Sequence, residues 1–296
     1  MILTLGDSVC WGQGLIEEHK FDSIFADARR MKCTRVAHSG AVIGALSDTS
    51  TQVETGEVPV AFPSVWQQIL ARTDWSQVEL VLMNGGINDI SVGRILSPLT
   101  TPARLTQMVD QFCLRNMQGL LEALAAKLAG REVRIAVIGY YPILSDQSRQ
   151  TETQLRALLE LNGVATSSVF APEELSVGAF VPGIIANCIT FWQESNRALQ
   201  AAVDGANAAA GRNVALFVKL PFAEENAMWA PQSLLWELTP LLLPEDEVSN
   251  PRGAACAALY GDIVHFPRLI QCQRASAGHP RVQGAATIAN TLLAVL

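Results

Sequence analysis

The chain opens with MILTLGDSVCWGQG, residues 1–14, and this stretch decides the predicted fold. The apolar run Ile2–Leu5 is typical of a buried strand, and Gly6-Asp7-Ser8 ends it with residues that favour turns and helix starts. Ser8 is therefore expected at the carboxyl end of a strand, the edge where open α/β sheets bind ligands. At this point Ser8 has two interpretations, a nucleophile or a simple helix cap.

Short apolar runs of the same kind recur along the chain and alternate with helix-period segments. The predicted strands are Ile2–Leu5, Thr34–Ala37, Glu79–Met83, Val133–Ile138 and Val214–Val218. The predicted helices are Phe62–Arg72, Arg104–Leu128, Phe191–Ala210, which ends at Gly211, and Val282–Leu296. Continuous apolar runs are typical of parallel strands covered on both faces. The alternation therefore predicts an α/β fold, a three-layer α/β/α sandwich.

The expected domain organisation is a single domain over residues 1–296 with two large insertions, at about 145–190 and 222–270. Long connections without a regular pattern are often lids or site-forming segments. These insertions are unusually apolar, through Trp229, Leu234, Leu235, Trp236, Leu241, Leu242 and Leu243, together with Phe180, Val181, Ile184 and Ile185. They have two interpretations, a lid or acyl-chain pocket and an additional layer of buried core, and the second is favoured.

Composition excludes several classes of function. The chain has 296 residues, is 49% hydrophobic and 17% charged, and so can bury a core without metal or disulfide cross-links. A net charge of -7 with 21 Lys and Arg argues against a nucleic-acid or anionic-membrane partner. No apolar run reaches the length of a membrane span. No leader sequence precedes Ser8, so the chain is expected to be either cytoplasmic or exported with its leader removed.

The cysteines are spread singly, at 10, 33, 113, 188, 256 and 272, without the paired spacing of a zinc site. We therefore expect no metal and no cofactor. Cys10, Cys33 and Cys113 are predicted to be buried thiols. Cys256 and Cys272 flank a loop and could form a disulfide if the mature protein is exported.

Chemistry-bearing residues follow the predicted strands at the same edge of the sheet. Acyl transfer requires a nucleophilic hydroxyl, a base that takes its proton, and donors aimed at the developing oxyanion. Ser8 supplies the hydroxyl and His279, just before the last helix, supplies the base. The Gly40 N–H and the Asn88 side-chain amide supply donors. Asp7 and Asp89 stand beside these residues and are expected to cap helices or hold loops.

This constellation resembles the SGNH family of GDSL-type esterases and lipases. The resemblance covers Gly6-Asp7-Ser8 with Trp11-Gly12-Gln13-Gly14, then Ser39-Gly40-Ala41, Gly86-Ile87-Asn88-Asp89, and His279-Pro280 with Gly284, Ile288 and Ala289. It implies Ser8 as the nucleophile, His279 as the base, and the Ser8 N–H, Gly40 N–H and Asn88 as the oxyanion hole. It also implies a flavodoxin-like sheet of five parallel strands.

One position departs from the family pattern, which has an aspartate three residues before the histidine. Here that residue is Ser276. A literal Asp-x-x-His occurs at Asp262–His265, but no glycine-spaced helix follows it, so we interpret it as unrelated to the site. Our hypothesis is a Ser8–His279 dyad in which the main-chain carbonyl at or near Ser276 orients the imidazole. Asp262 is the alternative carboxylate that this hypothesis must exclude.

The resulting prediction is a serine hydrolase that cleaves carboxylic esters of small-molecule or lipid substrates through an acyl-enzyme. The apolar insertions favour a lipase, a phospholipase or a general esterase. One alternative is a carbohydrate O-acetylesterase. A second is a non-catalytic binding module that keeps the fold and has lost the acid.

Overall fold

A five-stranded parallel sheet forms the centre of the computed structural model, which describes residues 1–51, 57–58, 62–164, 177–262 and 264–296. The strands are β1 (Ile2–Leu5), β2 (Cys33–Arg35), β3 (Leu80–Met83), β4 (Arg134–Ile138) and β5 (Ala215–Val218). Their order is β2-β1-β3-β4-β5, and every neighbouring pair is parallel. Strands β1 and β3 are buried along their whole length, as their apolar runs predict.

Helices connect and cover these strands. They are α1 (Ser8–Trp11), α2 (Phe21–Arg29), α3 (Val65–Ala71), α4 (Ile87–Ile90), α5 (Val92–Leu96), α6 (Pro102–Val109), α7 (Met117–Lys127), α8 (Glu152–Leu161), α10 (Val181–Ala210), α11 (Ser249–Tyr260), α12 (Phe266–Gln273) and α13 (Val282–Val295). Short 3-10 helices lie at Glu17–His19, Val177–Phe180 and Glu224–Asn226, and a π-helical segment at Asp110–Asn116.

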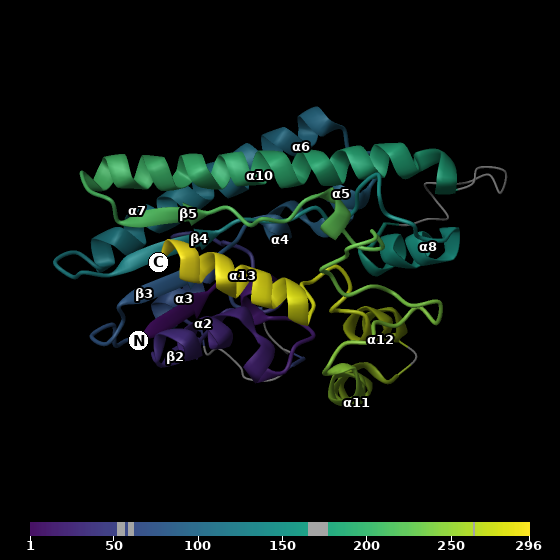
Figure 1. Cartoon of the computed structure of the whole chain (residues 1–296), viewed down its shortest axis with the longest axis horizontal. Helices are drawn as coiled ribbons and strands as arrows, with labels where there is room; N and C mark the ends of the chain where they lie inside the picture. The colour runs from purple at the N-terminus through teal and green to yellow at the C-terminus, as the bar shows by residue number, and fades with distance from the viewer. Residues whose placement is uncertain (52–56, 59–61, 165–176, 263) are drawn as a thin grey trace.

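The helices form two layers around the sheet (Figure 1). Helices α2 and α13 pack against each other on one face, while α7 and α10 pack against each other on the opposite side. This arrangement confirms the predicted α/β fold of three layers. Strand β1 is flanked by β2 on one side and β3 on the other. The crevice beyond the carboxyl ends of β1 and β3 is therefore the topological switch point at which such sheets bind ligands.

Three of the differences between the predicted and the observed element boundaries have an identifiable cause or consequence. Strand β2 ends at Arg35 because the N–H groups of Val36 and Ala37 both donate to the Thr4 carbonyl, which ends the regular ladder. The helix predicted over Arg104–Leu128 is two α-helices joined by the π-helical segment. Helix α10 begins ten residues before the predicted Phe191, with Pro182 in its first turn. Part of the first expected insertion is thus the start of this 30-residue helix.

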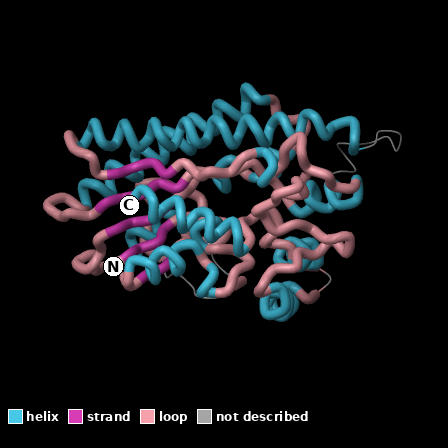
Figure 2. Tube along the Cα trace, viewed as in Figure 1, coloured by secondary structure: helices cyan, strands magenta, loops and turns pink. Residues whose placement is uncertain are grey.

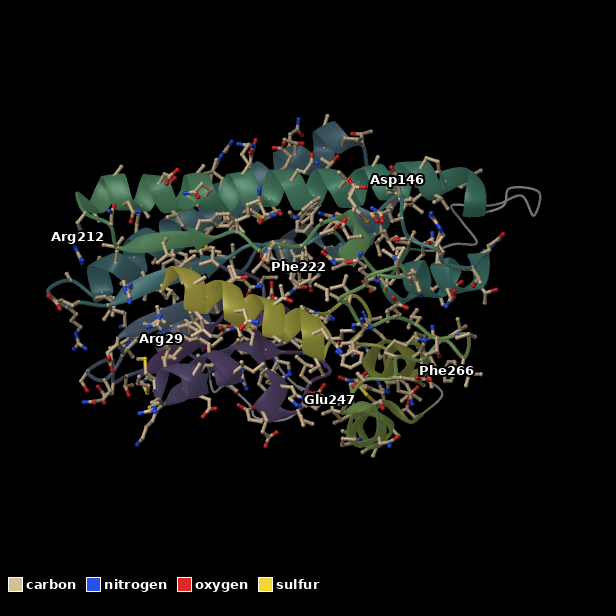
Figure 3. All side chains as sticks on the ribbon, viewed as in Figure 1. Arg29, Asp146, Arg212, Phe222, Glu247 and Phe266 are labelled. Carbon is tan, nitrogen blue, oxygen red and sulfur yellow. A yellow bond between two sulfur atoms is a disulfide. The ribbon has the colours of Figure 1, made fainter. Side chains whose placement is uncertain are left out.

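Both expected insertions contribute helices beyond the carboxyl ends of the strands (Figure 1). Helices α8, α11 and α12 lie beyond the carboxyl ends of the strands, joined largely by loops (Figures 1 and 2). Residues 165–176 and Ile263 lie outside the described residues. A disulfide between Cys256 and Cys272 joins α11 to α12, the pairing considered from the sequence. Glu247, labelled in Figure 3, contacts the N-terminal segment, since its carboxylate lies 2.6 Å from Nδ1 of His19.

Nine of the eleven apolar side chains named for the insertions are buried in the main hydrophobic cluster or pack against it. Ile184, Trp229 and Leu235 are buried in the main hydrophobic cluster, whereas Leu241 is 83% exposed. The favoured interpretation, an additional layer of core, therefore holds for these three residues. Two of the three cysteines predicted to be buried thiols, Cys10 and Cys113, are buried, and Cys33 is half-buried. No helix in the described parts of the chain is long and apolar enough to cross a membrane.

Candidate active site

Ser8 is the first residue of helix α1, directly after strand β1. Asp7 caps this helix, because its Oδ1 accepts a hydrogen bond from the Val9 N–H at 2.9 Å. The helix cap that the sequence left open for Ser8 is therefore supplied by Asp7, and Ser8 lines the pocket. Only 7% of Ser8 is exposed.

Asp7 also ties together the ends of three strands. The Tyr140 hydroxyl donates to Asp7 Oδ2 at 2.7 Å, and the Asn84 amide donates to Oδ1 at 2.8 Å. Burial raises the pKa of Asp7, and these hydrogen bonds oppose that increase. Asp89 plays a similar part, since its carboxylate accepts from the Ile43 N–H at 2.9 Å. Both aspartates hold backbone, as their positions after strands predict.

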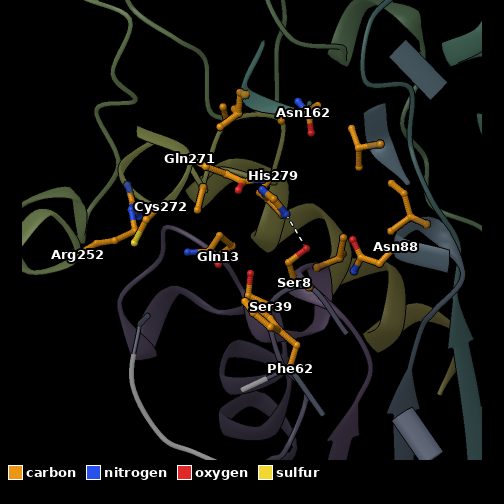
Figure 4. A pocket seen from close by; sticks show the side chains of 18 of the residues that line it. Ser8, Gln13, Ser39, Phe62, Asn88, Asn162, Arg252, Gln271, Cys272 and His279 are labelled. Atoms are coloured by element: carbon orange, nitrogen blue, oxygen red, sulfur yellow. Dashed lines mark hydrogen bonds between the residues drawn. The ribbon is translucent and has the colours of Figure 1, made fainter. Parts of the chain in front are cut away.

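His279 meets Ser8 although the two residues are 271 positions apart. Its Nε2 lies 2.7 Å from Ser8 Oγ, the contact drawn as a dashed line in Figure 4. Its Nδ1 lies 3.2 Å from the main-chain oxygen of Ser276. A carbonyl only accepts hydrogen bonds, so Nδ1 carries the proton and Nε2 accepts from the Ser8 hydroxyl. This is the tautomer that a general base acting on Ser8 requires.

The environment of His279 keeps the imidazole neutral. Burial is the main reason that its pKa is lowered to about 4, and the positive charge of Arg252 acts in the same direction. The hydrogen bond to Ser276 and the negative charge of Asp246 act in the opposite direction. Around neutral pH the ring is therefore unprotonated and able to take a proton from Ser8.

The three predicted oxyanion donors surround the same pocket as Ser8. Among the residues that the structure describes, the N–H groups of Ser8 and Gly40 donate to no other group. Gly40 has φ of +79°, and a Cβ there would lie 2.7 Å from Phe62 Cδ1, so the position requires glycine. Asn88 Nδ2 donates one N–H to the Ala41 carbonyl at 2.9 Å, which leaves its second N–H for a ligand.

The pocket has a volume of about 490 Å³. Strand ends supply Ser8, Gly40 and Asn88, helix α8 supplies Leu158 and Leu161, and α12 supplies Gln271. In Figure 4, Asn88 lies on the far side of Ser8 from Arg252 and Cys272, and Asn162 lies above His279. None of the Trp229–Trp236 side chains among the described residues lines it. Much of the apolar lining comes from α5, α8 and the loop after β4, whose residues were not among the apolar side chains that the sequence singled out.

The buried carboxylate of Asp246 lies near His279, whereas Asp262, the alternative considered from the sequence, does not line the pocket. Asp262 lies on the surface, where its side chain is 60% exposed and bonds Nδ1 of His265 at 2.8 Å. Asp246 is buried, and its Oδ2 accepts a hydrogen bond from the Ser276 hydroxyl. Arg252, which is also buried, pairs with Asp246. No spacing rule connects Asp246 to His279, because it lies 30 residues before Ser276 in a segment without a recognisable motif.

Comparisons with known proteins give fold similarity only. No family model and no curated protein matches the chain. An active-site mutant of a family two carbohydrate esterase from Clostridium thermocellum is similar to it at 12% identity and a TM-score of 0.46, over 99% of this chain and 62% of that chain. A candidate arylesterase from Agrobacterium tumefaciens is similar at 11% identity and a TM-score of 0.43, over 99% of this chain and 96% of that one.

A third similar structure is a candidate SGNH hydrolase from Slackia heliotrinireducens, at 16% identity and a TM-score of 0.38, over 98% of this chain and 95% of that chain. The chain thus spans about 62% of the length of the Clostridium protein. With identities and TM-scores this low, the function has to follow from this chain's own residues.

Proposed function

We propose that the chain is a serine hydrolase that cleaves carboxylic esters through an acyl-enzyme. The observation that carries the proposal is the 2.7 Å contact between Ser8 Oγ and His279 Nε2, in a pocket that Gly40 and Asn88 also line. A nucleophile, a base in the required tautomer and oxyanion donors converge on one point.

The steps follow from this arrangement. Ser8 Oγ bonds to the ester carbonyl carbon while its proton passes to His279 Nε2. The carbonyl oxygen becomes an oxyanion and accepts from the N–H groups of Ser8 and Gly40 and from the Asn88 amide. The bond to the alcohol oxygen then breaks, and His279 returns the proton to the leaving alcohol. A water molecule repeats the sequence and releases the acid, which restores Ser8.

Covalent labelling tests this proposal against the non-catalytic binding module. We expect an organophosphate to add one mass increment at Ser8, and Ser8→Ala to remove it. Ser39→Ala is the matched control, because Ser39 lines the same pocket and should leave labelling intact. If the folded wild-type protein takes no label and hydrolyses no nitrophenyl ester, the binding module is the better explanation.

For the substrate, we propose esters with an apolar acyl chain, as a lipase, a phospholipase or a general esterase would use. Apolar side chains from α5, α8 and the loop after β4 line one side of the pocket, namely Val92, Ile143, Leu158 and Leu161. Side chains of Arg268, Gln271, Cys272 and Ala275 line another part from α12 and the turn after it. The apolar side suits the acyl chain and the α12 side suits a polar alcohol. The segments at about 145–190 and 222–270 thus supply walls of this pocket.

Acyl-length preference tests the substrate class. Rates on nitrophenyl esters from acetate to dodecanoate should rise beyond acetate. Leu161→Trp should lower kcat/KM for the longest esters by about tenfold and leave acetate almost unchanged, because it fills the apolar side. Leu99→Trp is the control, since Leu99 is 72% exposed. A preference confined to acetate would instead favour the carbohydrate O-acetylesterase.

A further inference from the structure

A buried carboxylate lies behind His279 at a position that no motif marks. The side chain of Asp246 is fully buried. Its Oδ1 accepts from the Val248 N–H at 3.1 Å and from Arg252 Nη1 at 2.9 Å, and its Oδ2 accepts from Arg252 Nη2 and from the Ser276 hydroxyl. Each of these four contacts comes from a donor, so together they hold the carboxylate in one orientation as an acceptor.

Ser276 connects this carboxylate to the imidazole. Its hydroxyl donates to Asp246, while its carbonyl accepts from the N–H of His279 at 2.9 Å and lies 3.2 Å from His279 Nδ1. The residue is completely buried. Gly14, which has φ of +88°, packs so closely that a Cβ there would lie 2.7 Å from the Ser276 Cβ. Ser276 therefore has little room to turn, and Asp246 fixes the residue whose main-chain carbonyl orients the histidine.

Arg252, which pairs with Asp246, also contacts a second carboxylate. It lies 3.3 Å from Glu57 Oε1, and Gln13 donates to the same oxygen at 2.6 Å. Burial raises the pKa of Glu57, and the positive charges of Arg252 and Lys20 oppose that increase. Asp246 raises the pKa of His279 and Arg252 lowers it, so the imidazole is exposed to the charge of both. A negative charge behind Nδ1 stabilises the imidazolium that forms when Ser8 loses its proton.

We propose that Asp246 is a positioning residue for His279, acting through the hydroxyl and carbonyl of Ser276 in place of a carboxylate bonded directly to the imidazole. This inference rests on the proposed esterase function. No proton moves to Asp246 in any step. Nδ1 keeps its proton and donates a hydrogen bond to the Ser276 carbonyl, and the Ser276 hydroxyl keeps its proton and donates a hydrogen bond to Asp246.

The test uses Ser276→Ala, Asp246→Asn and the double variant. Ser276→Ala removes only the connecting hydroxyl and keeps the buried Asp246–Arg252 pair, so it remains informative if Asp246→Asn fails to fold. We expect each single variant to lower kcat by about tenfold with KM within twofold. The double variant should be no slower than the slower single variant, because both changes break one connection.

The pH profile separates positioning from general damage. In Asp246→Asn the acidic limb of kcat/KM should move to lower pH, because the imidazolium loses a negative neighbour and keeps Arg252. Ser145→Ala is the matched control: Ser145 is also fully buried and its hydroxyl donates to the Glu224 carbonyl at 2.7 Å, outside the pocket. It should leave both kcat and the acidic limb unchanged.

Either of two results would overturn the inference. One is a kcat within twofold of wild type in Ser276→Ala. The other is a double variant whose loss of kcat is the product of the two single losses, together with an acidic limb of kcat/KM that does not move in Asp246→Asn. Organophosphate labelling keeps this outcome distinct from failure of the proposed function. If wild type is not labelled at Ser8, the esterase proposal fails. If wild type and both variants are labelled at equal rates, the esterase proposal stands and the role of Asp246 is wrong.

Discussion

Two segments of the chain place a histidine three residues after an oxygen-bearing side chain, and they lie in opposite environments. Ser276 is buried and His279 is half-buried against Ser8. Asp262 and His265 bond each other on the surface, with side chains 60% and 42% exposed. The surface pair matches the family spacing literally, whereas the pair in the pocket lacks the aspartate. A base needs a nucleophile within hydrogen-bond reach, so position in the fold decides between them.

The largest expected effect tests directly which of the two histidines acts as the base. His279→Ala should lower kcat by about 10⁴-fold, because Ser8 loses its base. His265→Ala removes the histidine of the surface pair and should leave kcat within twofold. Steady-state rates on one nitrophenyl ester check both variants. Similar losses in the two would mean that the pocket geometry does not identify the working histidine.

The second effect concerns the proposed oxyanion donors, which line the same pocket as His279. Asn88→Ala should lower kcat by about 10²–10³-fold with KM little changed, since the amide acts on charge that develops in the transition state. Asn162→Ala is the control, because Asn162 lines the same pocket and its amide donates to the Leu158 carbonyl. It should act on KM more than on kcat. Equal kcat losses would remove Asn88 from the proposed oxyanion hole.

The third effect is the pH dependence set by burial of His279. Because its pKa is lowered to about 4, kcat/KM should be flat from neutral pH to about 5 and fall about tenfold per unit below 4. Stability should respond as well. An unfolded histidine has a pKa of about 6.5, so between pH 6.5 and about 4 the unfolded chain binds more protons than the folded chain. The contribution of His279 to the free energy of unfolding is therefore lost as pH falls from about 6.5 toward 4.

Chemical denaturation at several pH values measures that contribution. His279→Ala should remove it, so the variant's stability should depend less on pH between about 6.5 and 4 than that of wild type. An acidic limb of kcat/KM centred near 6.5 would show that His279 is not desolvated as the structure places it.

The smallest expected effect comes from the surface carboxylate. Asp262→Asn should change kcat by less than twofold, since Asp262 contacts His265 and lies on the surface between α11 and α12. Measuring kcat of Asp262→Asn and Asp246→Asn in the same assay compares the surface carboxylate with the buried one. A loss of several orders of magnitude in Asp262→Asn would contradict the Ser8–His279 dyad.

Sequence patterns predicted the sheet and the main pocket residues because both depend on local signals. Strands β1, β3, β4 and β5 each carry a short apolar run. Ser8 and Asn88 lie in the short helices that follow β1 and β3, so the parallel topology brings them together. Asp246 was missed for the opposite reason. Its contact with Ser276 depends on how a long, irregular segment folds back over the sheet edge, and no spacing specifies that path. The early start of α10 was missed because Pro182 and Gly183 read as breakers, although proline is tolerated in a first helical turn.

The disulfide between Cys256 and Cys272 changes how Ser8 and His279 are connected covalently. The two residues lie on opposite sides of it in the sequence, with the surface pair Asp262–His265 inside the loop that it closes. A single cut in that loop, for example after the exposed Arg268, would leave both halves in one molecule under oxidising conditions. Reduction would then separate a fragment that carries the nucleophile from one that carries the base.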